Sequence, residues 1–393
     1  MYTSESHLPA TREDFVLACL EGSGENARRW LEALDGVCSE TVARHAASVD
    51  QERRSPAESL KALRDIGAFG VQIPVSHGGL GLGNAMAALA VERTARACAS
   101  TAAILMFHYQ VVHRTVRYGD ELQQKRDLPA MAAGERIAAS AWTEPGPSKS
   151  KSDVKTSLAG RADALFVEGT KTYCTGLDSA SVIDVLVNAS TDDGHGPTFV
   201  RVDADHPGVG REIYPMLGLR GTSTGTVTLS RVPVSPSAVI GGVGEARQLM
   251  RANHETPLNP ALLALGIASS ALGRALQVVR EQAAEPAPVL LSESRAHRLA
   301  ATTVALESVY AYAARLVRGI AAAPHDAYAA SSKLKVAATT VAEDLTRSLT
   351  HVVGSRGFLV EYELERHLRD AQATALMGPG NELCLRRIAD DLV

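Results

Sequence analysis

Three long apolar stripes between residues 262 and 349 constrain the fold of this chain more than any other feature. In each stripe, apolar or small residues recur at alternating steps of three and four, which places them on one face of an α-helix. The first stripe begins at Leu262, the second at Leu306 and the third at Leu334. Long helices joined by loops predict an antiparallel bundle, because each helix must bury its apolar face.

The residue pattern of the chain changes near Ile137. Runs rich in β-branched residues, separated by Gly, Pro and Asp, continue for about 100 residues and end near Val243. We expect strands at 181–187, 198–202 and 226–229, and a strand, a turn and a second strand within 164–173. A region of this kind between two helical regions predicts a small antiparallel β domain.

The first third of the chain is predicted to be helical. Pro56 precedes a run that has Leu60, Leu63 and Ile66 on one face, as expected for a helix with proline in its first turn. The predicted fold class is therefore α+β, with an N-terminal α-helical domain (1–136), a central antiparallel β domain (137–243) and a C-terminal four-helix bundle domain (244–393).

Composition narrows the cellular setting. The net charge is −4, which does not favour binding to nucleic acid or to an anionic membrane. No apolar run of about 18 residues and no signal-peptide pattern is present. The five cysteines are scattered, without a CxxC pair. We therefore expect reduced cysteines, no metal site and a cytoplasmic protein.

The stretch 351–384 carries the most specific pattern in the chain. It contains a glycine-interrupted segment, Gly354–Phe358, then a charged run with the triplet Arg369-Asp370-Ala371, and then Gly378-Pro379-Gly380. This order resembles the C-terminal region of the acyl-CoA dehydrogenase family. Further landmarks follow the family in order: Trp142–Gly146, Tyr173–Thr175 and Leu217–Thr222. The resemblance extends from about Pro56 to Leu383 and implies the same three-domain fold.

The resemblance also implies a cofactor, FAD, and the residues that would contact it. The matching positions are Trp142, Thr143, Tyr173, Thr175, His351, Gly354 and Gly357. They predict a cleft between the β domain and the bundle that holds the flavin ring. Family members assemble as dimers or tetramers, so a homodimer or homotetramer is expected. Ser152 matches a serine of the family pattern on the substrate side and follows an insertion that bears Lys149 and Lys151.

Several groups that the family uses are absent from this sequence. Gly378 stands where most members carry the glutamate that removes the substrate α-proton, and Pro260 occupies the alternative position of that base. Glu285 lies in the segment where many members have an arginine that reaches the flavin diphosphate of a neighbouring subunit. Gly380 replaces a threonine. His254, Glu255 and Glu382 are the remaining weak candidates for a base, although each is more easily explained as a structural or solvent-exposed residue.

Three functions remain open at this stage. The first is a flavin-dependent oxidoreductase, monooxygenase-like or oxidase-like, that acts on a small or carrier-bound metabolite without the usual glutamate. The second is an acyl-CoA or acyl-carrier-protein dehydrogenase with a relocated base. The third is a flavin-free descendant that binds a ligand or performs non-redox chemistry.

Overall fold

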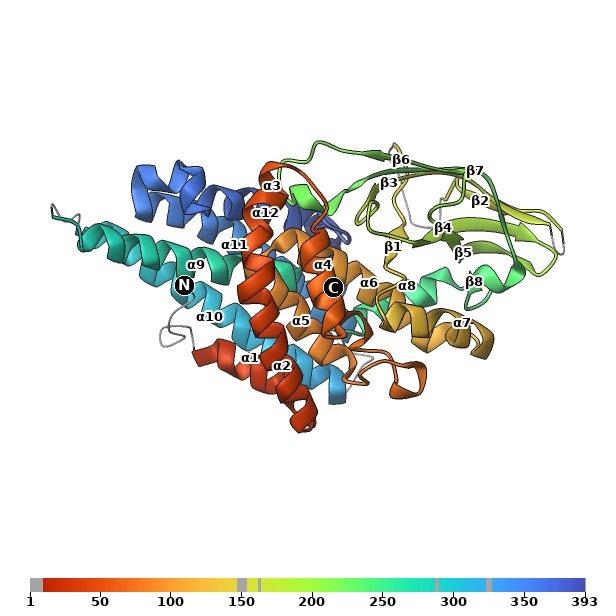
Figure 1. Cartoon of the computed structure of the whole chain (residues 1–393), viewed down its shortest axis with the longest axis horizontal. Coiled ribbons are helices and arrows are strands. Elements are labelled where there is room, and N and C mark those ends of the chain that lie inside the picture. Colours follow the sequence, from red (N-terminus) through yellow and green to blue (C-terminus); the bar gives the residue numbers. More distant parts are fainter. Residues whose placement is uncertain (1–9, 147–153, 162–163, 287–289, 323–326, 393) are drawn as a thin grey trace.

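The computed structural model describes residues 10–146, 154–161, 164–286, 290–322 and 327–392. Insertion residues Lys149 and Lys151, and the predicted substrate contact Ser152, lie outside these ranges. Within them the chain forms two helical regions on either side of a sheet (Figure 1). This arrangement confirms the predicted α+β class with its helical, β and helical order.

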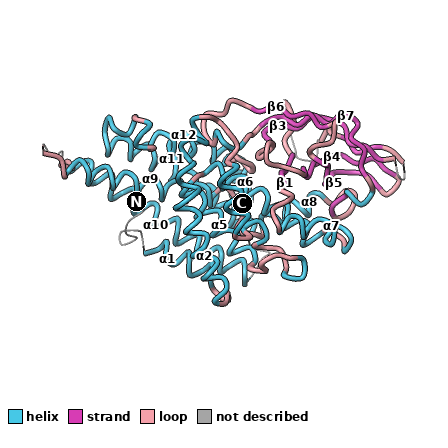
Figure 2. Tube along the Cα trace, in the orientation of Figure 1, coloured by secondary structure: helices cyan, strands magenta, loops and turns pink. Residues whose placement is uncertain are grey.

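The N-terminal region consists of helices, as predicted. Figure 2 shows how little strand it contains. The helices are α1 (Ala10–Leu20), α2 (Glu25–Val37), the π-helical segment η1 (Cys38–Val42), α3 (Ala43–Gln51), α4 (Ala57–Asp65), α5 (Gly83–Ala97), α6 (Ala99–Tyr118) and α7 (Glu121–Ala132). Asp120 and Gln123 form a capping box at the start of α7, which fixes where this helix begins.

The described residues of the central region form one eight-stranded sheet. Its strands are β1 (Ala138–Ala141), β2 (Ser157–Ala159), β3 (Leu165–Cys174), β4 (Val182–Thr191), β5 (Gly194–Asp203), β6 (Val209–Ile213), β7 (Gly225–Val234) and β8 (Val239–Ile240). The order is β6-β7-β3-β2-β4-β5-β8, with β1 beside β4.

The sheet differs from the prediction in two respects. Residues 165–174 form the single strand β3 rather than two strands, because the glycine at 169 marks a bulge and not a turn. In addition, β1 and β2 both pair parallel with β4, although the other pairings are antiparallel. β1 pairs with Val182–Val185 and β2 with Asn188–Ser190, so the two short strands pair with successive parts of β4.

The C-terminal region is the predicted bundle. Its helices are α8 (Ala246–His254), α9 (Ala261–Ala283), α10 (Glu293–Ala322), α11 (Ala327–Val353), α12 (Leu364–Leu376) and α13 (Asn381–Asp390). One continuous apolar core joins α9, α10, α11 and α12 to helices of the N-terminal region. By length and composition α9 could span a membrane, but 67% of its most apolar window is buried in this core, as expected for a central bundle helix.

Candidate active site

The structure brings Thr143, Tyr173 and Thr175 together at one end of the sheet. The backbone N–H of Thr172 donates to the carbonyl of Thr143 at 2.8 Å, which joins the segment after β1 to the end of β3. Tyr173 has a φ of +55°, an uncommon conformation for a bulky residue, and 66% of its surface is exposed. Backbone strain of this kind is concentrated at functional sites, which supports a binding role for this edge.

A chain of hydroxyl groups fixes the hydrogen-bonding direction at Thr175. Thr222 donates to the carbonyl of Leu219 at 2.8 Å, so its only hydroxyl proton is used. Thr224 must then donate to Thr222 (2.8 Å), and Thr175 must donate to Thr224 (3.2 Å). Thr175 Oγ1 is therefore left as a hydrogen-bond acceptor toward a ligand.

Tyr173 is supported from behind by a second tyrosine. The rings of Tyr173 and Tyr214 lie 5.4 Å apart in an edge-to-face arrangement. The hydroxyl of Tyr214 is within 2.5 Å of Thr226 Oγ1, so the supporting ring is held at both ends. The pair presents an aromatic surface to solvent that suits a planar ligand.

Glu144 anchors the segment that carries Thr143. Its carboxylate accepts hydrogen bonds from Lys171 Nζ and from the backbone N–H groups of Lys155 and Thr156, each at 2.8 Å. Burial alone would raise the pKa of Glu144, but these donors outweigh it and lower the pKa to about 2. Glu144 is therefore a structural anion and not a proton acceptor at neutral pH.

Trp142 points away from this edge, toward the helices. Its ring lies 5.3 Å from the ring of Phe199, and the guanidinium of Arg114 lies over both rings. This environment matches the alternative of a packing residue more closely than that of a cleft wall. Burial lowers the pKa of Arg114, which still remains charged at neutral pH.

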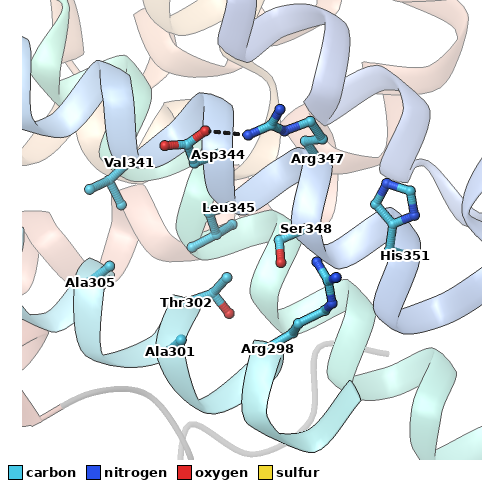
Figure 3. A pocket seen from close by; sticks show the side chains of 10 residues that line it. All are labelled: Arg298, Ala301, Thr302, Ala305, Val341, Asp344, Leu345, Arg347, Ser348 and His351. Carbon is cyan, nitrogen blue, oxygen red and sulfur yellow. Dashed lines mark hydrogen bonds and ion pairs between the residues drawn. The ribbon is translucent and has the colours of Figure 1, made fainter. Parts of the chain in front are cut away.

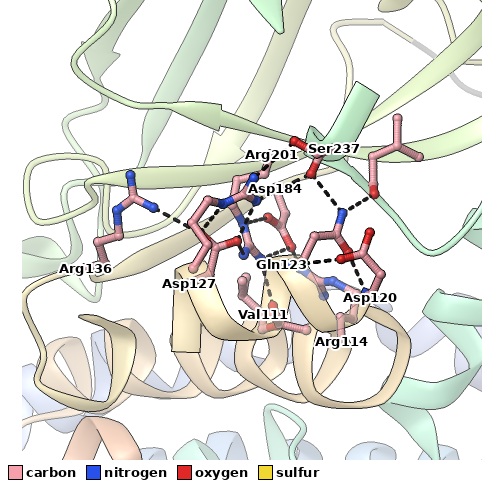
Figure 4. Close-up of polar contacts among 12 residues, drawn as sticks. Val111, Arg114, Asp120, Gln123, Asp127, Arg136, Asp184, Arg201 and Ser237 are labelled. Carbon is pink, nitrogen blue, oxygen red and sulfur yellow. Dashed lines mark hydrogen bonds and ion pairs between the residues drawn. The ribbon is translucent and has the colours of Figure 1, made fainter. Parts of the chain in front are cut away.

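Arg114 belongs to a buried ionic network beneath the sheet (Figure 4). Its Nη2 donates to Ser140 Oγ at 2.6 Å and approaches Asp184 at 3.3 Å. Arg201 binds Asp184 more closely, at 2.8 Å, and also binds Asp127 at 2.8 Å. Helix α6 is joined to the sheet by these contacts. Sequence analysis missed Arg114, although an arginine on the apolar face of α6 was a usable signal.

Helix α12 approaches the site through residues 217–222. The backbone N–H of Leu219 donates to Asp370 at 2.6 Å, and a side chain at Gly218 would collide with the backbone of Arg369. Burial raises the pKa of Asp370 to about 6. From Asp370 the helix continues to Leu376, and Gly378 follows. A Cβ placed at Gly378 would meet no atom within 4 Å, so packing does not demand glycine there.

The candidate bases are not gathered around Gly378 by any contact in the described residues. His254 packs its ring edge against Tyr328 at 4.9 Å, and burial lowers its pKa to about 4, so it is neutral at pH 7. Glu255 is the half-buried C-cap of α8, and Glu382 is exposed in the first turn of α13. Pro260 is the N-cap of α9.

A lysine that sequence analysis overlooked holds the turn that contains Gly378. Lys335 is buried on α11, and its Nζ donates to the carbonyl of Ala375 and to Asn381 Oδ1, both at 2.8 Å. These two partners lie on either side of the turn. Burial lowers the pKa of Lys335 to about 8. The signal in the sequence was a lysine next to the apolar stripe that starts at Leu334.

The other predicted cofactor residues lie elsewhere in the chain. His351, Gly354 and Gly357 are at the end of α11 and in the following 3-10 helix η7 (Gly354–Phe358), at the end of the bundle remote from the sheet (Figure 1). Gly354 has a φ of +81°, and a Cβ at Gly357 would meet the Thr350 backbone at 3.0 Å. The structure therefore does not bring this group to Thr143 and Tyr173 within one chain.

The remote end also contains an open groove between α10 and α11, with a volume of about 570 Å³ (Figure 3). Arg298, Arg347 and the exposed His351 are among its lining residues, and Arg347 pairs with Asp344 at 2.7 Å. Glu285 is bound by Arg356 at 2.6 Å. The repulsion that Glu285 would exert on a nearby diphosphate is thus offset by a cation from η7.

Family models match both helical regions of the chain. The acyl-CoA dehydrogenase N-terminal domain matches residues 24–135, and the acyl-CoA dehydrogenase C-terminal domain matches residues 246–393. Cyclohexane-1-carbonyl-CoA dehydrogenase of Geobacter metallireducens is 28% identical and aligns 94% of this chain with 98% of its own length. The 3-sulfinopropanoyl-CoA desulfinase of Paraburkholderia xenovorans is 26% identical, with coverages of 90% and 92%.

Solved structures share the whole fold. Butyryl-CoA dehydrogenase of Megasphaera elsdenii superimposes with a TM-score of 0.86 at 21% identity, and covers 94% of this chain and 98% of its own. FMN-bound TdsC of Paenibacillus sp. A11-2 gives a TM-score of 0.82 at 21% identity, with coverages of 93% and 97%. At this level of identity the likeness concerns the fold.

Proposed function

The chain belongs to the acyl-CoA dehydrogenase family, and from that premise we propose that it is a flavin-dependent oxidoreductase that works without a carboxylate base. Its substrate is a small metabolite, free or bound to CoA or a carrier protein. The observation that carries this proposal is a contrast in side chains. The hydroxyl and aromatic groups at the end of the sheet are present, whereas Gly378 and Pro260 occupy both base positions.

The residues at the end of the sheet fit a flavin ring. An isoalloxazine is planar and has an N–H donor on its polar edge, so an aromatic side chain and a hydrogen-bond acceptor are suitable partners for it. Exposed Tyr173 offers the wall, and Thr175 offers an acceptor whose direction is fixed by the threonine chain. Thr143 adds an exposed hydroxyl two residues after β1. When bound, the flavin supplies the redox chemistry.

The chain's own residues then have defined tasks. Thr175 Oγ1 would accept a hydrogen bond from a flavin N–H and so help to orient the cofactor. Tyr173, supported by Tyr214, would shield the flavin from water. Glu144 holds the backbone of Thr143 in place through three donors. None of these tasks needs a base that removes a proton from carbon.

Relatives with different chemistry support a reaction other than ordinary dehydrogenation. One aligned relative is a desulfinase. Two structural neighbours are TdsC, solved with FMN and indole, and a prolyl acyl carrier protein oxidase. A fold that serves these reactions is compatible with the loss of the glutamate in this chain.

A dehydrogenase with a relocated base is the second candidate, and His254 is the observation that favours it. Burial lowers the pKa of His254 to about 4, which keeps its imidazole unprotonated at pH 7 but makes it a weak base, so the position of His254 and not its pKa supports this candidate. His254 also shares a contact network with the helix after Gly378, because Arg387 of α13 lies over the same Tyr328 ring.

The oligomeric state is part of the proposal. His351, Gly354 and Gly357 can reach the flavin of the sheet only if they come from a second copy of the chain. We therefore expect a homodimer or homotetramer, and a monomer in light scattering at micromolar concentration would contradict this expectation.

The colour and reactivity of the purified protein test the proposed function. We expect flavin absorbance, or its recovery after addition of FAD, and no rapid bleaching by saturated straight-chain acyl-CoA. Rapid bleaching by these thioesters would favour the relocated-base dehydrogenase. A colourless protein that cannot be reconstituted with FAD would contradict both candidates and leave the flavin-free alternative.

A further inference from the structure

The hydroxyl chain formed by Thr222, Thr224 and Thr175 is held in place by the backbone around it. At one end, Thr222 donates to the carbonyl of Leu219, and the backbone N–H of Leu219 donates to Asp370 of α12 at 2.6 Å. Toward the other end, the backbone N–H that follows Thr175 donates to the carbonyl of Thr222 at 2.8 Å. These contacts fix the positions of the hydroxyl groups relative to one another.

Strained backbone surrounds the hydroxyl chain. Six non-glycine residues in the described part of the chain have a φ in the left-handed region. Three of them, Tyr173, Leu219 and Ser223, with φ values of +55°, +52° and +46°, lie in the two segments that carry the hydroxyl groups. Such conformations are unfavourable for residues other than glycine and persist where surrounding contacts impose them. A cluster that only fills space does not require this strain.

Burial preserves the direction of the hydroxyl chain. Thr222, Thr224 and Thr175 are 1%, 7% and 8% exposed, which leaves little access for water to their protons. Each hydroxyl has one proton, and each proton is used by the next member, the last by the carbonyl of Leu219. An isolated threonine can rotate its hydroxyl and either donate or accept. Thr175 can only accept a hydrogen bond from a ligand.

This restriction matters at a ligand atom that changes its own hydrogen-bonding role. The N–H on the polar edge of a flavin is present in the oxidised and the reduced form, and a freely rotating hydroxyl would bind it equally well. Reduction adds two electrons and one proton to the ring, and the nitrogen N5 changes from a lone-pair acceptor to an N–H donor. A rotating hydroxyl can bind N5 in both forms, whereas an acceptor of fixed direction can bind only the N–H form.

We propose that Thr222 and Thr224 are positioning residues that hold Thr175 as an acceptor and so make the site favour reduced over oxidised flavin. This inference rests on the proposed function and deepens it by naming the flavin N–H that Thr175 meets. Tighter binding of the reduced form raises the midpoint potential, so the flavin takes two electrons more readily from the substrate that loses them. The competing explanation is that the three threonines are packing residues.

Thr224→Val is the direct test of the hydroxyl chain. It keeps the volume and removes the acceptor of the Thr175 proton, so that Thr175 can turn and donate to oxidised flavin. We expect the ratio of affinities for reduced and oxidised flavin to fall by about tenfold, as for one hydrogen bond, which lowers the potential of a two-electron couple by about 30 mV. Dithionite reduction of the flavin-loaded full-length protein beside a reference dye would measure it. Thr224→Ser retains the hydroxyl and should keep the wild-type potential.

Thr222→Val acts one step further from the ligand. Without the hydroxyl of Thr222, Thr224 can donate to Thr175 instead, which frees the Thr175 proton and should also lower the potential. The carbonyl of Leu219 keeps a hydrogen bond from the backbone N–H of residue 222 at 3.1 Å, so the loop retains its support. Thr346→Val is the matched control and should keep the wild-type potential, because Thr346 is also 1% exposed and donates to a backbone carbonyl at 2.8 Å.

A flavin analogue tests which ring atom Thr175 meets. 5-Deaza-FAD has a C–H group in place of N5 and therefore presents no lone pair to Thr175. In fluorescence titrations of the apoprotein, we expect Thr224→Val to bind oxidised FAD more tightly than wild type does. The two proteins should bind 5-deaza-FAD equally.

An unchanged potential in Thr224→Val and Thr222→Val, with flavin bound in both, would overturn the inference and leave the proposed function intact. An equal loss of affinity for oxidised and reduced flavin would also overturn it, because Thr175 would then meet an N–H that both forms carry. An equal fall in Thr224→Ser and Thr224→Val would indicate packing. If urea unfolding shows that Thr224→Val does not fold, Thr222→Val decides the question. Failure of the wild-type protein to bind flavin would contradict the proposed function and this inference together.

Discussion

The end of the sheet and helix α12 both contact residues 217–224, and α12 leads on to the turn before α13, but the sheet end and this turn differ in what their side chains can do. At the sheet, Thr224 joins the hydroxyl chain that orients Thr175. At the helix, the backbone of Leu219 is bonded to Asp370, and the turn beyond α12 consists of Met377, Gly378, Pro379 and Gly380. One region is rich in fixed polar groups, and the other has none at the position of the base.

Packing does not explain why position 378 lacks the carboxylate base. Gly218 cannot accept a side chain, because the backbone of Arg369 occupies the space, whereas Gly378 has open space around it. The turn is nevertheless held firmly by Lys335, through Ala375 and Asn381. A supported turn without a reactive side chain agrees with the proposed function, in which the chemistry comes from other groups.

Gly378→Glu is the change that should have the largest effect, because it restores a carboxylate to the turn. A positioned general base contributes roughly 10²–10⁴-fold, so we expect at least about a hundredfold gain in the rate of flavin reduction by butyryl-CoA. Stopped-flow absorbance would measure it. Gly378→Gln has the same size and cannot act as a base, so it should stay at the wild-type level.

Two outcomes would contradict the proposed contrast between the sheet end and the turn. If wild type already reduces its flavin rapidly with butyryl-CoA, a base lies elsewhere and His254 becomes the first residue to replace. If Gly378→Glu and Gly378→Gln are equally slow while both bind flavin, the turn does not face the reacting carbon.

Glu144→Gln should have a smaller effect and tests whether the sheet end is held by charge. The carboxylate of Glu144 has a pKa lowered from 4.5 to about 2, so its stabilisation is complete above pH 4.5 and is lost as the pH falls toward 2. The variant should lose about 1–3 kcal/mol at pH 7, because Lys171 keeps its buried ammonium without this carboxylate. Urea unfolding between pH 2.5 and 7 would measure the difference.

The pH dependence provides the control for this prediction. Wild type should lose stability between pH 4.5 and 2 more steeply than Glu144→Gln, so the two curves converge in acid. Glu168→Gln replaces an exposed carboxylate on β3 and should follow wild type throughout. Parallel curves for wild type and Glu144→Gln would show that the carboxylate charge contributes little.

The sequence predicts the helices and the order of regions well, because apolar periodicity and proline positions are local signals. Leu262, Leu306 and Leu334 are all buried where their stripes place them. It also predicts Thr143, Tyr173 and Thr175 as site residues, and the pairing of Thr143 with Thr172 brings these three close together. The relative direction of the strands was harder to predict. The parallel pairing of β1 with β4 depends on how the chain connects the two strands, which local composition does not encode.

Other features depend on partners that are distant in the chain. The direction of Trp142 is set by Arg114 and Phe199, and the role of Lys335 is set by Asn381. A motif names such residues but not the side of the backbone on which their side chains lie. Gly354 and Tyr173 also lie apart within one chain. A family pattern can assign two residues to one site although they come from two copies of the chain.

Thr143→Val and Tyr173→Ala should have the smallest effects, and they sharpen the comparison by asking whether the sheet end binds a ligand at all. Thr143→Val preserves volume at an exposed position, so the free energy of unfolding should change by about 1 kcal/mol or less. Tyr173→Ala removes an exposed ring, which costs little packing. In a flavin site both changes should weaken FAD binding, by about threefold for one hydrogen bond and up to about tenfold for one aromatic face. Fluorescence titration of the refolded apoprotein would measure these affinities, with Tyr118→Phe as a control away from this edge. If both variants retain wild-type affinity and turnover, Thr143 and Tyr173 are ordinary surface residues, and the ligand site must be sought elsewhere.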